Sequence, residues 1–326
     1  MAMLPPDPVY SLRCSEMDAV SSVCFHGNER LLAGTIKGNV FMWNLQTNRP
    51  AFHFKVGEQP ITSLHHSPER LVTQEKGGTV TLWTMSNNCY ARDRTISGNY
   101  LGYCHSAMHM SPNNPHGSVK LFYPCDRSTI GVLHITDPTE PIQKLVPYGP
   151  NLPQLGAVSC FTSFEFSSNL FLLAGYESGH FLTWNVTLGT VVDMIAGLGP
   201  QPTTVDYDLV TNRGVIGGAS DKITVFSYQR PPTIKVLRGT ELLVRNAGLN
   251  CVRIRGDRKV FASAGWDGRI RIFSWKSMRS LAVLLQHKHG SIMDLAFSPQ
   301  KVAMWGAPIM AAAGMDGQIS LWSLYN

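Results

Sequence analysis

Short runs of alternating apolar and polar residues fill this chain, and one pattern among them recurs. Small residues and a tight turn are followed by alternating apolar residues that end in Trp or Phe. Six clear copies of the pattern cover residues 33–43, 77–83, 174–184, 219–226, 264–273 and 313–322. Because a period of two residues is typical of half-buried β-strands, each copy predicts two strands joined by a hairpin.

The spacing of the copies predicts seven units. Their aromatic ends are 40, 101, 42, 47 and 49 residues apart, so one interval is about twice the others. A degenerate third unit is expected inside it, with strands near residues 100–103, 119–123 and 132–135. A further strand upstream of each hairpin gives small antiparallel sheets at the spacing of β-propeller blades.

We therefore predict an all-β chain that forms one seven-bladed propeller over residues 1–326. The expected blades are residues 14–55, 56–95, 96–150, 151–196, 197–238, 239–283 and 284–326. The last blade ends without an outer strand, and residues 8–13 are expected to supply it and close the ring. Within the hairpins, Asp-Gly at 267–268 and 316–317 predicts two-residue turns, with Gly38 and Gly179 at the corresponding points.

Composition agrees with a turn-rich β protein. The 326 residues are 44% hydrophobic and 15% charged, with 29 Gly and 20 Pro. No apolar run long enough to span a membrane occurs, and the first residues do not resemble a secretion signal. Seven scattered cysteines predict reduced thiols rather than disulfides. We expect a cytoplasmic protein, and leave a nuclear location open.

The repeats resemble the WD-repeat family, although the Trp-Asp pair of that family is absent. Asn44, Thr84, Asn185 and Ser323 follow the repeat tryptophans instead. The hydrogen-bonded Asp-His-Ser/Thr-Trp network of many members is expected to be broken, with His287 and Asp316 as its only remnants.

A closer resemblance covers nearly the whole chain. Residues 172–179, 238–242, 257–267, 269–273 and 319–325 resemble the guanine-nucleotide-binding protein beta-subunit-like protein 1 family. The resemblance implies similarity to the fungal ASTRA-associated WD protein. It also implies a non-enzymatic adaptor beside the trimeric co-chaperone that matures phosphatidylinositol-3-kinase-related kinases. No G-protein γ subunit is expected, because about seven residues precede the closing strand where G-protein β subunits carry a coiled-coil helix.

Candidate chemistry in the sequence is weak. Cys104, His105, His109 and His116 are metal-ligating residue types, but their spacing matches no usual zinc pattern, and we interpret them instead as part of a proline-rich loop. Residues 197–199 read as a turn rather than a phosphate loop, because Pro200 follows and no helix does. Motifs of serine hydrolases, P-loop enzymes and zinc hydrolases are absent. We therefore predict no enzyme activity, cofactor or metal.

Charge suggests a first partner-binding region. Twelve Lys and Arg but only three acidic residues lie between positions 230 and 279. Such a sector would steer an acidic protein partner towards it, and a chromatin- or nucleic-acid-associated scaffold is the alternative. Sparse aromatic residues disfavour nucleic acid, and a merely solvated edge is a further alternative. The candidate residues are Arg253, Arg255, Arg258, Lys259, Arg269 and Arg271.

Hairpin position suggests a second region. Trp266, Met315 and Ile36 each precede the central turn, in the sixth, seventh and first units. If these side chains are exposed, they form an apolar patch of the kind that marks a protein interface. If they fold inward, they belong to the core.

Overall fold

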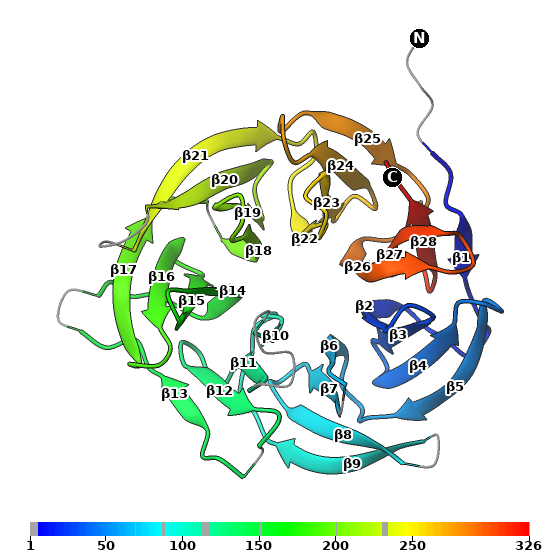
Figure 1. Ribbon diagram of the computed structural model, residues 1–326, viewed down its shortest axis with the longest axis horizontal. Helices are drawn as coiled ribbons and strands as arrows, with labels where there is room; N and C mark the ends of the chain where they lie inside the picture. Colours follow the sequence, from blue (N-terminus) through cyan, green and yellow to red (C-terminus); the bar gives the residue numbers. More distant parts are fainter. Residues whose placement is uncertain are drawn as a thin grey trace. The chain divides into compact units, whose positions relative to one another are not determined.

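The computed structural model describes residues 6–68, 70–86, 89–111, 118–137, 139–149, 152–199, 201–229 and 234–325. These residues form seven four-stranded antiparallel sheets (Figure 1). The chain divides into two compact units, residues 1–66 with 245–326 (unit 1) and residues 67–244 (unit 2). Within the described ranges, no helix is long and apolar enough to cross a bilayer.

Unit 1 contains three complete sheets and one strand of a fourth. The first sheet holds β2 (Val20–His26), β3 (Arg30–Thr35), β4 (Asn39–Asn44) and β5 (Arg49–Lys55). The sixth holds β22 (Leu249–Ile254), β23 (Val260–Gly265), β24 (Ile270–Ser274) and β25 (Ser280–Leu284). The seventh holds β26 (Ile292–Val302), β27 (Ala307–Gly314), β28 (Ile319–Ser323) and β1 (Tyr10–Leu12). Strand β6 (Ile61–His66) is the first strand of the second sheet.

Unit 2 contains the other strands. The second sheet continues with β7 (Arg70–Glu75), β8 (Val80–Ser86) and β9 (Cys89–Ile96). The third holds β10 (Ala107–His109), β11 (Lys120–Pro124), β12 (Ile130–His134) and β13 (Gln143–Leu145). The fourth holds β14 (Val158–Phe166), β15 (Asn169–Tyr176), β16 (His180–Asn185) and β17 (Thr190–Ala196). The fifth holds β18 (Pro202–Asp208), β19 (Arg213–Gly218), β20 (Lys222–Gln229) and β21 (Lys235–Leu243).

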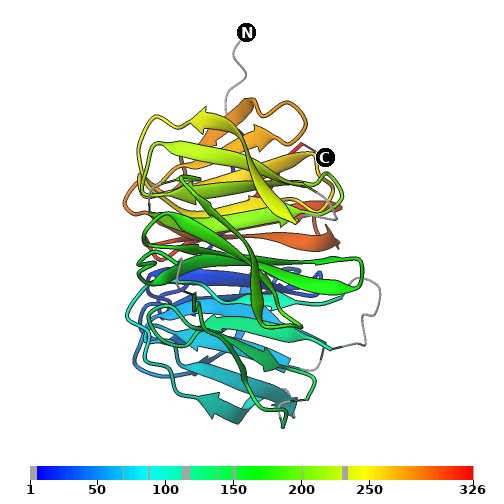
Figure 2. The same cartoon turned by 90° about the vertical axis from the view of Figure 1, so that its left-hand side faces the viewer.

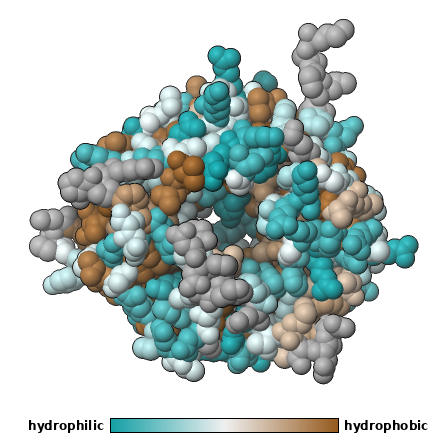
Figure 3. Space-filling model, viewed as in Figure 1, coloured by the Kyte–Doolittle hydropathy of each residue, from teal (hydrophilic) through white to brown (hydrophobic). Residues whose placement is uncertain are grey.

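The burial of each strand follows its place in the sheet. Central strands such as β23 are buried at every residue, and Val260, Ala262 and Ala264 of β23 lie in one core cluster with residues of the seventh sheet. In β17, the fourth strand of the fourth sheet, exposed residues alternate with half-buried ones. Figure 2 is turned so that β17 faces the viewer, at the outer edge of its sheet. Two of its exposed residues, Val192 and Met194, are apolar, and Figure 3 shows apolar residues gathered in this region.

The predicted closing strand is confirmed. β1 pairs antiparallel with β28, with Tyr10 opposite Leu321 and Leu12 opposite Ile319. The side chain of Leu12 is fully buried in a cluster that contains Ile319, Leu321 and residues of the first sheet. Residues from the two ends of the sequence therefore share one sheet and one core.

The predicted strand at residues 100–103 is wrong. The third sheet begins instead with β10, and Tyr100 makes only a single bridge to Gly77. Its ring is buried and its hydroxyl donates to the carbonyl of Val158, so the side chain, not a strand ladder, fixes this segment. Leu101 is 90% exposed, which is incompatible with a strand packed into the core.

Within the units, one sheet boundary and the length of the Asp-Gly turns also differ from expectation. β21 continues past a bulge opposite Thr224 and Phe226 to Leu243, so residues 239–243 lie in the fifth sheet rather than the sixth. The Asp-Gly turns are three-residue loops, because Gly265 pairs with Arg269 around residues 266–268. Only the glycine has a positive φ, 72° at Gly268, as in a type I turn closed by a glycine bulge. The prediction of one domain over the whole chain stays a prediction.

Candidate protein-interaction surface

The three-residue loops hold Trp266, Met315 and Ile36 in equivalent positions. Each residue comes first in its loop, and its backbone N–H donates at 3.0 Å to a carbonyl of the segment that enters the same sheet. The acceptors are Gly248, Ser291 and Ala19. Because these bonds fix the backbone, the side chains leave the sheets from rigid positions.

The indole of Trp266 is oriented by two contacts. Its Nε1 donates to Oδ1 of Asn250 at 2.7 Å, so the one polar atom of the ring is satisfied. The ring packs on Gly248, where an added Cβ would come within 2.2 Å of indole carbons. Trp266 is still 48% exposed. A fixed, half-exposed indole is typical of a residue that gains its remaining burial from a partner.

Other apolar side chains lie at the same end of unit 1. Met315 is 37% exposed and Leu285 is 51% exposed, whereas Ile36 is half-buried. The sheets that carry them are neighbours, since β22 contacts β26 and β26 contacts β2. We call this surface the Trp266 end. It comprises residues 13–19, 36–38, 56–60, 245–248, 266–269, 285–291 and 315–317. Its role in partner binding stays a prediction.

Two of the predicted basic residues are buried and paired. Arg271 donates to both carboxylate oxygens of Asp267, at 2.6 and 3.2 Å. Burial by itself would raise the pKa of Asp267, but the hydrogen bonds from Arg271 and Asn246 lower it below the usual value. Arg255 donates to Asp257 and to the carbonyls of Leu324 and Tyr325. These two arginines stabilise the sheets. Because their side chains are buried and paired, their charges are not exposed to a partner.

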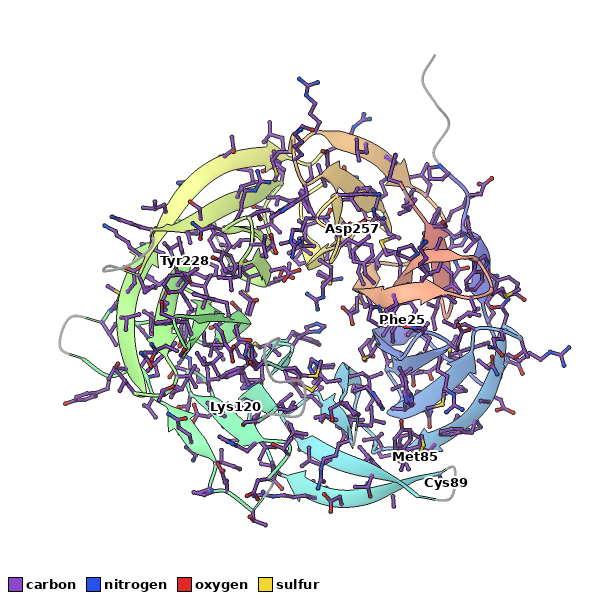
Figure 4. All side chains as sticks on the ribbon, viewed as in Figure 1. Phe25, Met85, Cys89, Lys120, Tyr228 and Asp257 are labelled. Carbon is purple, nitrogen blue, oxygen red and sulfur yellow. The ribbon has the colours of Figure 1, made fainter. Side chains whose placement is uncertain are left out.

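The remaining predicted basic residues do not form one patch with Trp266. Arg253 lies 3.6 Å from the buried carboxylate of Asp294, and Arg269 lies 3.8 Å from that of Asp267. Arg258 and Lys259 are exposed, but they belong to the turn before β23, whereas Trp266 follows that strand. Asp257 of this turn is labelled in Figure 4. Arg258 and Lys259 therefore lie at the opposite end of β23 from Trp266, whereas Arg269 lies next to the loop of Trp266.

The hydrogen-bond network predicted to be broken is complete in the seventh sheet. Nδ1 of His287 lies 3.0 Å from Asp316, and its Nε2 lies 2.7 Å from Oγ of Ser320. The same hydroxyl accepts a 2.8 Å hydrogen bond from Nε1 of Trp322. In the sixth sheet, the Arg271–Asp267 pair bridges the corresponding turn directly.

The candidate metal-ligating residues that the structure describes are not brought together. Cys104 is buried, and burial raises the pKa of its thiol. His109 lies 3.1 Å from both Ser163 and Glu165, which hold its two ring nitrogens. His116 falls outside the described residues. In the part of the chain that the structure describes, no three His, Cys, Asp or Glu side chains are arranged to hold a metal ion.

Comparison with known proteins defines the class. The family model described as "WD domain, G-beta repeat" matches residues 6–44, 233–274 and 278–323. The solved β-propeller domain of Cps50 (Swd1) from Myceliophteria thermophila superimposes with a TM-score of 0.79. The match covers 98% of this chain and all of that domain, at 16% sequence identity. The protein is a seven-bladed β-propeller of the WD-repeat type.

Its relatives are more specific. The chain is 28% identical to the mouse guanine nucleotide-binding protein subunit beta-like protein 1, over 98% of this chain and 97% of that protein. It is 25% identical to ASTRA-associated protein 1 of Schizosaccharomyces pombe, over 99% of this chain and the full relative. A segment of 46 residues is 56% identical to ASTRA-associated protein 1 of Aspergillus niger, covering 14% of this chain and 10% of that protein. The resemblance predicted from the sequence is thereby confirmed.

Proposed function

We propose that this protein is a non-enzymatic adaptor that captures a partner protein at the Trp266 end. The observation that carries the proposal is the half-exposed indole of Trp266, which is fixed by Asn250 and Gly248 without being buried. Ordering such a ring in advance lowers the entropy cost of binding, so its apolar face contributes more affinity than a mobile side chain would.

The finer part of the proposal names the complex. Relatives that align over nearly the whole chain are called ASTRA-associated protein 1, which supports association with a multiprotein assembly. We propose that the protein assists a co-chaperone in the maturation of phosphatidylinositol-3-kinase-related kinases, in the cytoplasm and the nucleus.

A nucleic-acid scaffold that uses the predicted basic sector has less support. Four of the six predicted residues lie close to carboxylates, and two of these four are buried. Charge that is already compensated inside the protein releases no counterions from a phosphate backbone.

The test is affinity capture with the full chain carrying Trp266→Ala. We expect recovery of co-chaperone subunits and large kinases by the unchanged protein, and a loss of at least about tenfold in the variant, as for a hot-spot tryptophan. The matched control is Leu188→Ala, which truncates a residue that is 69% exposed in unit 2. It should leave recovery unchanged.

Thermal unfolding separates the two interpretations of Trp266. An unaltered Tm with lost capture supports a docking role, whereas a large drop in Tm places the side chain in the core. Capture that survives Trp266→Ala in a folded protein would overturn the proposed surface. Recovery of chromatin proteins alone, and only in the absence of nuclease, would overturn the co-chaperone role.

A further inference from the structure

Unit 1 has a second end, opposite the Trp266 end, that no part of the proposed function uses. It is built from the turns before β3, β5, β23, β25 and β27, together with the residues that flank β1 and β28. We call it the basic end. It comprises residues 6–8, 27–30, 45–49, 255–259, 275–279, 298–306 and 323–325.

Direct contacts join these turns into one surface. Trp275 N–H donates to the carbonyl of Lys259 at 2.9 Å, and the Arg255 guanidinium donates to the carbonyls of Leu324 and Tyr325. On the other side, Glu29 accepts from the N–H of Ala303 at 3.0 Å. The backbone carbonyl of Glu29 accepts a hydrogen bond from the N–H of Leu45 at 2.9 Å. The end is therefore a connected, hydrogen-bonded surface rather than a set of loose loops.

The two ends of unit 1 differ in charge. At the Trp266 end, five Lys and Arg face five acidic residues. The basic end has seven exposed cationic side chains among its described residues: Arg30, Arg49, Arg258, Lys259, Lys276, Arg279 and Lys301. Against them stand Asp7, Glu29 and Asp257. Solubility alone would not require charge of one sign to be confined to one end.

Most of this positive charge is not compensated inside the protein. Asp257 is already bound by Arg255 at 2.8 Å, and Oε1 of Glu29 accepts a hydrogen bond from the backbone N–H of Ala303. Lys276, Arg279 and Lys301 form no ion pair with any acidic side chain in the described ranges. The positive electrostatic potential of these side chains therefore extends from the basic end into the solvent.

Apolar side chains lie among the cations. Met304 is 51% exposed, at the tip of the hairpin between β26 and β27, and its sulfur accepts from Nδ2 of Asn48 at 3.5 Å. Tyr325 is 41% exposed beside the carbonyls that Arg255 holds. Met, Tyr and Arg are enriched at protein interfaces, and a thioether gives no specific contact to a phosphate backbone.

We propose that the basic end binds a segment of a partner protein in which acidic residues flank an apolar one. The cations of the five turns attract the acidic residues, and Met304 receives the apolar side chain. This surface shares no residue with the Trp266 end, so the two can hold different segments at once.

Fluorescence anisotropy with a labelled peptide that repeats Glu-Asp-Leu tests the proposal. The full chain is compared with the double variant Lys276→Glu/Lys301→Glu, in which affinity should fall by about tenfold or more at low salt. The matched control is Lys37→Glu/Lys288→Glu, which changes net charge equally at the Trp266 end and should keep most of the affinity. Met304→Ala should weaken this peptide but not one that repeats Glu-Asp-Ser.

Several outcomes would overturn the proposal. An equal loss in both double variants would mean that only net charge matters. Tighter binding of duplex DNA or of phosphatidylserine vesicles, lost in the same variant, would assign the surface to a nucleic acid or to a lipid headgroup. Trp266→Ala should leave peptide binding intact, so failure of the proposed function is distinguishable from failure at this end.

Discussion

At the scale of single residues, one hydrogen-bonded network links the turn before β28, strand β28 and the segment that leads into β26. His287 joins Asp316 in the turn to Ser320 in β28, and Ser320 also accepts from the indole of Trp322. Removing one member leaves a buried donor or acceptor without a partner, which costs about 1–3 kcal/mol.

We therefore expect both His287→Ala and Ser320→Ala to lower the free energy of unfolding. Because the two side chains are in contact, the double variant should be less destabilised than the sum, by about 0.5–3 kcal/mol. Urea denaturation of the unchanged protein, the two single variants and the double variant measures this double-mutant cycle. Lys288→Ala, at an exposed neighbouring residue, serves as the control. Strict additivity would contradict a shared network.

Some of these residue roles could have been found in the sequence. Ser320 and Trp322 are two positions apart in a strand, so they share a face, and this signal pointed to the complete network. Likewise Asp267 lies in a short hairpin loop and Arg271 in the strand that follows it, so the two could have been paired in advance. Counting charge along the chain cannot tell which arginines are compensated, because that depends on where strand register places the carboxylates.

At the scale of elements, β1 is short but carries one important side chain. Its Leu12 is fully buried among residues of two sheets, whereas Tyr10 on the same strand is 44% exposed. Three residues contribute little through their ladder alone, so the strand must be held mainly by this burial and by the Arg13–Gln318 hydrogen bond.

Leu12→Ala should therefore destabilise the protein by about 2–5 kcal/mol, the usual range for a buried leucine. Tyr10→Ala should cost less than about 1 kcal/mol, because most of the ring stays in water. Removal of residues 1–13 should cost at least as much as Leu12→Ala. The midpoint of urea unfolding compares the three, and equal effects of the two point variants would show that the strand does not act through Leu12.

The elements that were predicted well are those with a strong repeat signal. Hairpin glycines marked the turns between β3 and β4 and between β23 and β24, although three residues rather than two form each loop. The third sheet was predicted only in part, because Tyr100 is a buried aromatic in an apolar run that does not form a strand. The pattern of apolar residues cannot distinguish a buried aromatic residue in an irregular segment from one in a strand.

At the scale of the whole molecule, repeat spacing predicted the number of sheets, and the pairing of β1 with β28 agrees with the expected closure. The division of charge and apolar surface between the two ends of unit 1 could not be predicted. It depends on which turns share an end, and successive turns along the chain alternate between the ends.

Unit 1 also contains three histidines that resist protonation. Burial, and then the neighbouring His26, lowers the pKa of His66 to about 4. Burial and Arg30 lower the pKa of His26, whose ring stacks on His66 with 3.7 Å between centroids. Burial lowers the pKa of His287 despite the opposing effect of Asp316.

These shifts predict loss of stability in mild acid. In the unfolded chain a histidine takes up its proton near pH 6.5, whereas the folded protein excludes it until lower pH. The unfolded state then binds more protons, so the free energy of unfolding falls as pH drops from about 6.5 towards 4 and is unaffected by these groups above that window. Tm measured from pH 8 to pH 5 should show this slope. His66→Gln should reduce the slope by up to about one proton, worth about 1.4 kcal/mol per pH unit, whereas His289→Gln at an exposed site should not. The same slope in both variants would mean that other groups cause the acid sensitivity.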